Sequence, residues 1–382
     1  MGCVAFAHRV VAGLAGAPGT NLQPAGAVNR LQYSAIPESR WLTGARVTMV
    51  SEVLNKVADK LHNIDYVTWG LILGTALVSA LIVYLKKVKA EDRSIRDFFS
   101  FMFPEEVILH PSARADVMFW VTKRLIMPFL LIPAGITFVA AMGYATNRII
   151  SWIFGIEGPL IDGPPGPMTL VIFTATMLLA YDISYYLYHV AQHRYPFLWE
   201  LHKVHHSAEV MVGITKDRVH PLDDFMNRIW DGVIPGICFG IWSVIALNPV
   251  EVVVFGLNVY VVRNILMMDF VRHTHLPISF GPLDKIVLSP HWHQIHHSVD
   301  PRHYDKNFGL LFSFWDRLFG TSFVPDPKEE LKFGLVDRDV RDYQSLAGLY
   351  ILPLRKMWRV VAGRFQRNRT TLGAQTRDVS SS

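Results

Sequence analysis

The sequence is poor in cysteine and in charge. Its 382 residues include only two cysteines, Cys3 and Cys238, too few and too far apart for a disulfide framework or a thiolate metal site. Charged residues make up 18% of the chain, against about 25% in a typical soluble domain, while hydrophobic residues reach 51%. The formal net charge of +5 is too small to indicate nucleic-acid binding. This balance favours a membrane-embedded protein with flanking segments over a soluble one.

Apolar stretches long enough to cross a bilayer recur along the chain. Residues 68–85 carry no charge, and a helix of that length is about 27 Å long, close to the hydrocarbon core of a membrane. Further apolar stretches cover 125–144 and 168–188, and a helical hairpin is predicted over 233–247 and 250–262 with Asn248 and Pro249 at its tip. We therefore expect an all-α, polytopic membrane protein with about four to five transmembrane helices.

Basic residues predict the orientation of these spans. Lys86, Lys87 and Lys89 follow the first span, and Lys123 and Arg124 precede the second. Loops rich in Lys and Arg remain in the cytoplasm. The third span then returns to the cytoplasm, so every later histidine cluster is expected on that face, as a helical metal-binding cap.

Histidine is the residue in excess: 13 of the 16 histidines lie between His189 and His303. On a helix, residues at i, i+3 and i+4 share one face, so two or three such faces would bring eight imidazoles into one small volume. One metal ion rarely uses more than four protein nitrogens, so eight indicate two metals. The eight follow an HxxxH and two HxxHH patterns: His189, His193, His202, His205, His206, His293, His296 and His297.

The spacing leaves the metal open. Imidazole binds zinc, copper, iron and nickel, and the HExxH of many zinc hydrolases is absent from the sequence. Copper sites more often include Cys or Met, so an iron pair fits this donor set, with zinc as a possible substitute. The alternatives are a membrane zinc-dependent hydrolase and a non-catalytic, histidine-rich metal-binding membrane protein.

One carboxylate lies inside the predicted third span. Asp182 precedes His189 by seven residues, nearly the same helix face two turns away. A carboxylate within a span is costly unless it is paired. We expect Asp182 to accept a hydrogen bond from a ligand imidazole or from a nearby backbone donor, fixing the orientation of a ring.

The order of these motifs resembles the fatty acid hydroxylase/sterol desaturase superfamily. The resemblance covers about residues 170–325 and implies a helical, integral-membrane di-iron oxygenase whose metals lie on the cytoplasmic face. It rests on residues 182–189, 193–207, 220–222, 272–275, 281–283, 289–298, 305–309 and 315–321.

The resemblance also implies a ligand set, with the eight patterned histidines as catalytic metal ligands. His273 matches a lone family histidine and is expected as a ninth ligand, but His275 follows it where the family has a Ser-Asn pair, so His275 could replace or supplement it. His220 lies in an HPL segment and is expected, like Asp182, to support the ligands from behind. The expected metal ligands are therefore His189, His193, His202, His205, His206, His273, His275, His293, His296 and His297.

The activity implied is hydroxylation or desaturation of a C–H bond in a lipid such as a sterol, a hopanoid or a fatty acyl chain. Two iron ions are the expected cofactor and dioxygen the co-substrate. The sequence has no haem-binding or flavin-binding motif, so a separate cytoplasmic donor is expected, either a ferredoxin or a b-type cytochrome with its reductase. The lipid substrate is expected to enter from the bilayer.

Four regions are predicted from these observations. Residues 1–48 are expected to be a disordered leader or a mis-assigned start, and residues 49–168 an N-terminal transmembrane region. Residues 169–325 are the expected catalytic domain. Residues 326–382 are expected to form an amphipathic segment on the inner leaflet, followed by a disordered tail.

Overall fold

The structure is a computed structural model, and it describes residues 76–363 apart from 131, 162, 164, 247–258, 260–262, 264–268, 327–328 and 337–339, together with residues 70, 73 and 74. The chain divides into two units, residues 1–66 and 67–382, and the described residues belong to the second. The predicted leader at 1–48 and the second limb of the predicted hairpin, except Val259, lie outside the described residues.

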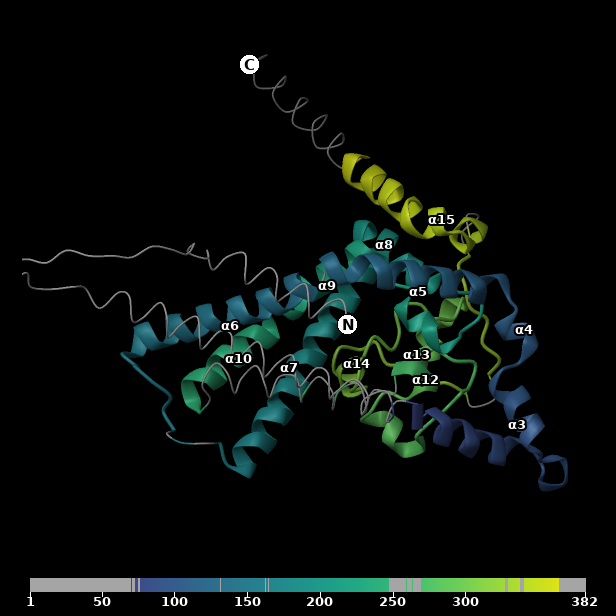
Figure 1. Cartoon of the computed structure of the whole chain (residues 1–382), viewed down its shortest axis with the longest axis horizontal. Helices are drawn as coiled ribbons and strands as arrows, with labels where there is room; N and C mark the ends of the chain where they lie inside the picture. Colours follow the sequence, from purple (N-terminus) through teal and green to yellow (C-terminus); the bar gives the residue numbers. More distant parts are fainter. Residues whose placement is uncertain are drawn as a thin grey trace, which may run out of the picture. The chain divides into compact units, whose positions relative to one another are not determined.

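The regular secondary structure of the described residues is helical, with no β-strand, which confirms the all-α prediction for this part of the chain (Figure 1). Two isolated antiparallel bridges, Val287 with Phe312 and Ser298 with Phe333, are their only sheet-like pairings. The α-helices are α3 (Ile95–Met102), α4 (Glu105–Ile108), α5 (Pro111–Leu130), α6 (Ile132–Phe154), α7 (Pro167–Arg194), α8 (Pro196–His206), α9 (Pro221–Asp231), α10 (Ile234–Ile245), α12 (Asp269–Arg272), α13 (Pro290–His296), α14 (Phe314–Leu318) and α15 (Leu346–Tyr350).

Two stretches are long and apolar enough to cross a membrane within the described part, Pro167–Arg194 (α7) and Pro221–Ile245 (α9 and α10). They include the predicted third span and residues 233–245 of the first limb of the predicted hairpin. The predicted span at 125–144 is helical but is shared between α5 and α6, and of the predicted span at 68–85 the structure describes mainly 76–85, which are helical. The count of four to five spans remains a prediction.

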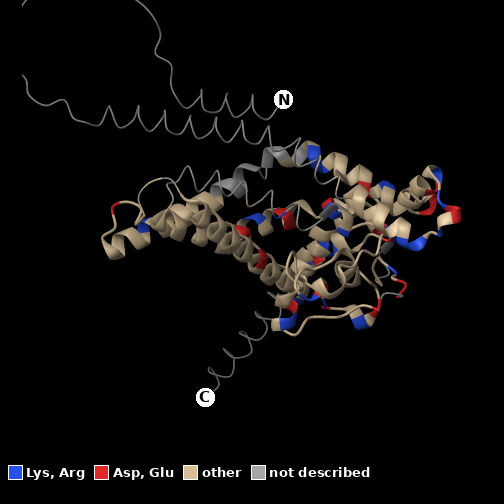
Figure 2. Cartoon of the chain, turned by 90° about the horizontal axis from the view of Figure 1, so that it is seen from below, with Lys and Arg blue, Asp and Glu red and all other residues tan. Residues whose placement is uncertain are grey.

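Helices α6 and α10 are almost free of charged residues, whereas Lys, Arg, Asp and Glu are frequent around α3 and α4 (Figure 2). Large apolar side chains on α7 and α10 face outward, among them Val171 (62% exposed) and Ile241 (41%). On a soluble protein such a surface would be an aggregation hazard, so the exposed residues fit contact with lipid.

Glycines allow α10 to lie close to α6. Gly236 and Gly240 are four residues apart, and a Cβ added at Gly240 would lie 2.6 Å from the Gly143 carbonyl oxygen. Small residues at this spacing let two helix backbones approach each other, as in membrane helix pairs. Phe173 and Met177 of α7 and Phe239 of α10 form the adjoining core.

Proline sets the boundary between the two helices that carry the first histidines. Helix α7 ends at Arg194 and α8 begins at Pro196. Proline suits the first helical turn, where its missing N–H would have no partner. The break lets α8 fold back so that its histidines face those at the end of α7.

Helix α8 is buttressed by residues far from it in the sequence. Val204 packs against Ala115 and Phe119 of α5 and against Tyr343 and Leu349 near the C-terminus, all of them buried. Buried residues within 340–350 thus belong to the core beside the histidine-bearing helices, and the amphipathic segment and disordered tail expected within 326–382 remain a prediction.

Candidate metal centre

Nine histidines from four segments converge at the end of α7. The ends of α7 and α8, the residue after α12 and helix α13 with its C-cap supply them. The rings are excluded from water: eight of the residues are between 1% and 5% exposed, and the side chain of the ninth, His193, is 9% exposed. They form two groups, one of five (His189, His193, His202, His206 and His296) and one of four (His205, His273, His293 and His297).

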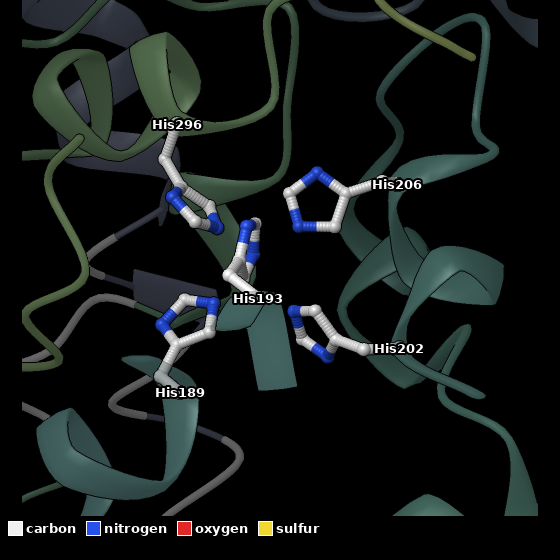
Figure 3. A group of neighbouring side chains, drawn as sticks. All are labelled: His189, His193, His202, His206 and His296. Atoms are coloured by element: carbon white, nitrogen blue, oxygen red, sulfur yellow. The ribbon is translucent and has the colours of Figure 1, made fainter. Parts of the chain in front are cut away.

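In the five-histidine group the Nε2 atoms face a common space (Figure 3). All five Nε2 atoms are buried and have no hydrogen-bond partner among the described residues. Behind the rings, four Nδ1 atoms face acceptors: His189 the Phe308 carbonyl (2.9 Å), His296 the Lys306 carbonyl (2.8 Å), His202 the Asp223 carboxylate (3.3 Å) and His193 the Asp305 carboxylate (3.4 Å).

These contacts define the tautomers. A carbonyl oxygen only accepts hydrogen bonds, so the Nδ1 atoms of His189 and His296 must carry their protons. The lone pairs then lie on Nε2 and point into the shared space. Metal-binding histidines are held in the same way, with the second ring nitrogen donating to a carbonyl or a carboxylate. The group is therefore built to receive a cation.

In the four-histidine group the Nε2 atoms approach one another directly. His273 Nε2 lies 3.2 Å from His205 Nε2 and 3.0 Å from His293 Nε2, and His293 Nε2 lies 3.1 Å from His297 Nε2. Nitrogens that each bind one ion at about 2.0–2.1 Å are separated from each other by about 2.9–3.4 Å. The spacing in this group is thus that of ligands around a single ion.

Each HxxHH triplet is divided between the two groups. On α8, His202 and His206 point to the five-histidine group and His205 to the other; on α13, His296 joins the five while His293 and His297 join the four. The groups adjoin, because the His206 and His297 rings stack with centroids 4.5 Å apart. A triplet that faces two sites at once explains why the pattern contains three histidines rather than two.

Burial disfavours the charged form of several of these rings. Desolvation lowers the pKa of His296 to about 4, and desolvation followed by repulsion from neighbouring imidazoles lowers the pKa of His206 and His297 well below the ordinary value. A neutral imidazole has a free lone pair for a metal, whereas a protonated one has none. The donor set therefore fits two imidazole-bound metal ions.

A tight loop at 305–309 supports two of the expected ligands, His189 and His296. Asp305 and Asn307 have positive φ angles of 57° and 54°, a conformation that Asp and Asn tolerate better than most residues. The Asn307 side chain donates to the carbonyl oxygens of Trp292 (3.0 Å) and Phe323 (2.9 Å). Asp316 accepts from the backbone N–H of Phe308 (2.8 Å), so the carbonyl behind His189 is held in place.

Two histidines expected at the site, His275 and His220, have other contacts. His275 Nε2 donates to the Phe101 carbonyl (2.9 Å), and His275 belongs to neither group. His220 caps α9: its Nδ1 accepts from Leu222 N–H (3.1 Å) and its Nε2 donates to the Tyr350 carbonyl (3.0 Å), so both ring nitrogens are occupied away from the ligands.

Asp182 does not contact an imidazole but binds the alternative partner that was expected, a backbone donor. Its carboxylate accepts from the backbone N–H groups of Leu311 (2.6 Å) and Phe312 (3.0 Å) and from the Trp315 indole (2.8 Å). These donors follow the 305–309 loop directly. Asp182 thus anchors the segment that supports the ligands and acts on the rings only through it.

Of the two carboxylates that contact these rings, Asp223 at His202 and Asp305 at His193, Asp223 is the buried one, and its role was not predicted. It is completely buried and accepts from Tyr188 hydroxyl (3.1 Å) and Gln192 amide (2.6 Å) on one oxygen and from His202 Nδ1–H on the other. Asp223 follows the His220-Pro221-Leu222 segment directly, and that position was the only signal available in the sequence. Nothing in the spacing of histidines points to α9.

Replacing Asp223 with Asn is expected to lower metal affinity by about 10–100-fold, the usual effect of losing the partner behind a ligand. Three donors converge on the carboxylate, and the amide of an Asn would oppose one of them with a donor of its own. Metal retention against a chelator measures the effect. Asp224→Asn is the matched control, because Asp224 pairs with Lys123 and Arg228 instead. Equal retention by the two variants would contradict the role of Asp223.

Comparison with known proteins gives matches over the part of the chain that holds this centre. The family model described as fatty acid hydroxylase matches residues 174–321. Alkylglycerol monooxygenase of Danio rerio is 32% identical over 41% of this chain and 31% of its own length. Cholesterol 25-hydroxylase of Homo sapiens is 27% identical over 38% of this chain and 48% of its own length. Lathosterol oxidase of Rattus norvegicus is 24% identical over 58% of this chain and 67% of its own length.

The alignments with the alkylglycerol monooxygenases of Caenorhabditis elegans and Danio rerio span less than a third of the length of those two proteins. No solved structure matches the chain. All nine converging histidines lie within the matched residues, and the resemblance stated from the sequence is confirmed. Residues 174–321 are therefore similar to fatty acid hydroxylase domains, and the matched relatives support the resemblance to the fatty acid hydroxylase/sterol desaturase superfamily.

Proposed function

We propose that the protein is a membrane-bound, dioxygen-dependent oxidoreductase that hydroxylates or desaturates a C–H bond of a lipid at a pair of irons. One observation carries the proposal: nine buried imidazoles form two adjoining groups, and the ring nitrogens of each group converge. The names of the matched relatives specify an alkylglycerol and a sterol, and both are lipids, which supports a lipid substrate.

The five-histidine group would hold one iron and the four-histidine group the other, with His273 rather than His275 as the ninth ligand. Two irons, when bound, supply the means to activate dioxygen and to oxidise an unactivated C–H bond. Imidazole nitrogens suit iron as well as zinc, and zinc could replace iron in a preparation. The ring nitrogens must stay deprotonated toward the metals, and the Asp223 carboxylate and the Phe308 and Lys306 carbonyls hold the opposite protons.

The surrounding chain would position the lipid and exclude water. His189 and His193 lie in the last turns of α7, so the apolar surface of this helix leads directly to the metal centre. A lipid could reach the centre along that surface without leaving the bilayer. We place the centre on the cytoplasmic side, where the Lys86–Lys89 cluster is expected, and infer that a ferredoxin or a b-type cytochrome with its reductase donates electrons there.

Lipid analysis of cells that express the chain tests the proposal. Extracts are compared with those of cells expressing His189→Ala, under isotopically labelled dioxygen and with iron measured on the purified protein. We expect a lipid that gains one labelled oxygen atom or loses two hydrogen atoms, and about two irons per chain. One zinc per chain and a product oxygen derived from water would indicate a hydrolase instead. Unchanged lipids with bound metal would indicate a non-catalytic metal-binding protein.

A further inference from the structure

A third cluster of ligand-type side chains lies outside the two histidine groups. Asp300, His303 and Glu329 place one potential ligand atom each within 4.8 Å of one another. Asp300 caps the start of the 3-10 turn Pro301–His303 and His303 is its last residue, and the His303 N–H donates to the Asp300 carbonyl (2.9 Å). Side chains three residues apart in a 3-10 turn lie on the same side. The turn therefore brings the carboxylate and the imidazole together.

Backbone pairing brings the third member to this turn. Val299 N–H donates to the Lys332 carbonyl (2.9 Å), and Ser298 and Phe333 form an antiparallel bridge. The segment after residue 328 thus runs back along residues 298–300. As a result Glu329 Oε1 lies 3.4 Å from His303 Nε2. The geometry of the cluster follows from the main chain and does not depend on side-chain rotamers alone.

The imidazole in this cluster is buried without a hydrogen-bond partner among the described residues. His303 is 1% exposed, packs on the edge of Phe323 with ring centroids 4.8 Å apart, and makes no hydrogen bond from either ring nitrogen within the described part of the chain. Buried polar groups almost always have a partner, and those that do not are often explained by an unseen water or ion. The ring is directed at two carboxylates, whose charge favours a cation.

An arginine occupies the remaining side of the cluster. The Arg302 guanidinium contacts the Asp300 carboxylate (2.7 Å) and also Glu329, and its side chain is 64% exposed. The two carboxylates thus already accommodate positive charge, supplied by a side chain that can turn out into water. A cation bound among Asp300, His303 and Glu329 would have to compete with this guanidinium.

We propose that Asp300, His303 and Glu329 form a third metal site, for a divalent transition-metal ion such as zinc, which displaces Arg302 on binding. One imidazole and two carboxylates are a donor set that zinc accepts at about 2.0–2.2 Å, whereas calcium and magnesium prefer oxygen alone. The ion would link Glu329 to the turn Pro301–His303, which precedes the 305–309 loop. It would thereby stabilise the loop whose carbonyl groups hold the His189 and His296 rings.

The test measures zinc on the full chain in detergent, after equilibration with zinc and removal of free metal. The wild type is expected to hold one ion more per chain than Glu329→Gln and His303→Asn, and zinc is expected to raise the thermal unfolding midpoint of the wild type above that of Glu329→Gln. Glu329→Gln preserves the shape of the side chain, so it remains informative if His303→Asn fails to fold. Arg302→Ala should bind the additional ion several-fold more tightly, since the competing charge is gone.

The zinc affinity of the Arg302→Ala variant distinguishes a metal site from a cluster of ion pairs that binds no metal. If Arg302→Ala leaves zinc affinity unchanged or weakens it, the three residues are held by the guanidinium alone and the site is refuted. An additional ion that persists in Glu329→Gln would likewise refute it. The additional ion should also remain in His205→Ala, which removes a ligand of the proposed iron pair, so failure of one proposal leaves the other intact.

Discussion

Product formation is expected to fall by more than ~100-fold when His205 is replaced with Ala, beyond the 10–100-fold that follows the loss of a partner behind a ligand. His205 Nε2 is one of the four that converge in the smaller group, 3.2 Å from His273 Nε2. Its ring also lies against those of His297 (4.6 Å between centroids) and His202 (5.6 Å), which belong to different groups. We expect iron content to fall from about two ions per chain to about one.

His275→Ala is the matched control for this variant. His275 was expected as a possible ligand, but its ring donates to the Phe101 carbonyl and it lies in neither group. The control variant is expected to retain two irons and to form product at close to the wild-type rate, as measured by metal analysis and lipid mass spectrometry. Intact iron and full activity in His205→Ala would refute the ligand assignment, and loss of iron in His275→Ala would refute the choice between His273 and His275.

The sequence made it possible to predict the histidines on the helices of this site but not those in the turns. The HxxxH and HxxHH spacings place rings on one helix face, and the proline break after α7 turns α8 toward it, so the eight patterned histidines could be named in advance. His273 and His275 come after α12 ends at Arg272. Outside a helix the periodicity no longer determines the direction of a side chain, so spacing could not decide between them.

The groups that hold the ligand rings from behind could not be predicted from local sequence patterns. Asp223 lies 21 residues from the His202 ring that it holds, on another helix, and the Phe308 carbonyl lies 119 residues from His189. Every residue has a backbone carbonyl, so the residue type does not show which carbonyl accepts a hydrogen bond from a histidine. The cost of burying a carboxylate did single out Asp182, and the structure accounts for that cost through three donors at 311–315. The physical rule identified the residue but not its partner.

Arg218→Met is expected to destabilise the fold by about 3–5 kcal/mol, the usual cost of leaving a buried charge without its partner. Arg218 is 1% exposed, and its guanidinium lies 2.8 Å from the completely buried Asp116 carboxylate of α5. It also donates to the carbonyl oxygens of Val204 (3.2 Å) and Ser207 (3.3 Å), at the end of α8, and to that of Tyr343 (2.8 Å). The last carbonyls of a helix have no partner within it, and Arg218 supplies one.

Thermal unfolding in detergent measures this loss, with Arg124→Ala as the control. Arg124 is 54% exposed and lies 3.9 Å from Asp217, so its removal is expected to cost at most about 1 kcal/mol. Combining Arg218→Met with Asp116→Leu should restore part of the stability, because no charge then remains buried alone. A double variant as unstable as the sum of the two single variants would show that the pair has no special coupling.

The Arg218 variant should also release metal more readily, which gives the prediction its functional consequence. Helix α8 carries three of the nine histidines, and its last turn is held by Asp116 and Tyr343 through the same guanidinium. Both residues lie outside the matched range 174–321. Loss of metal in Arg218→Met, but not in Arg124→Ala, would mean that the fatty acid hydroxylase domain depends on α5 and on residues 340–350 to keep its ligands in place.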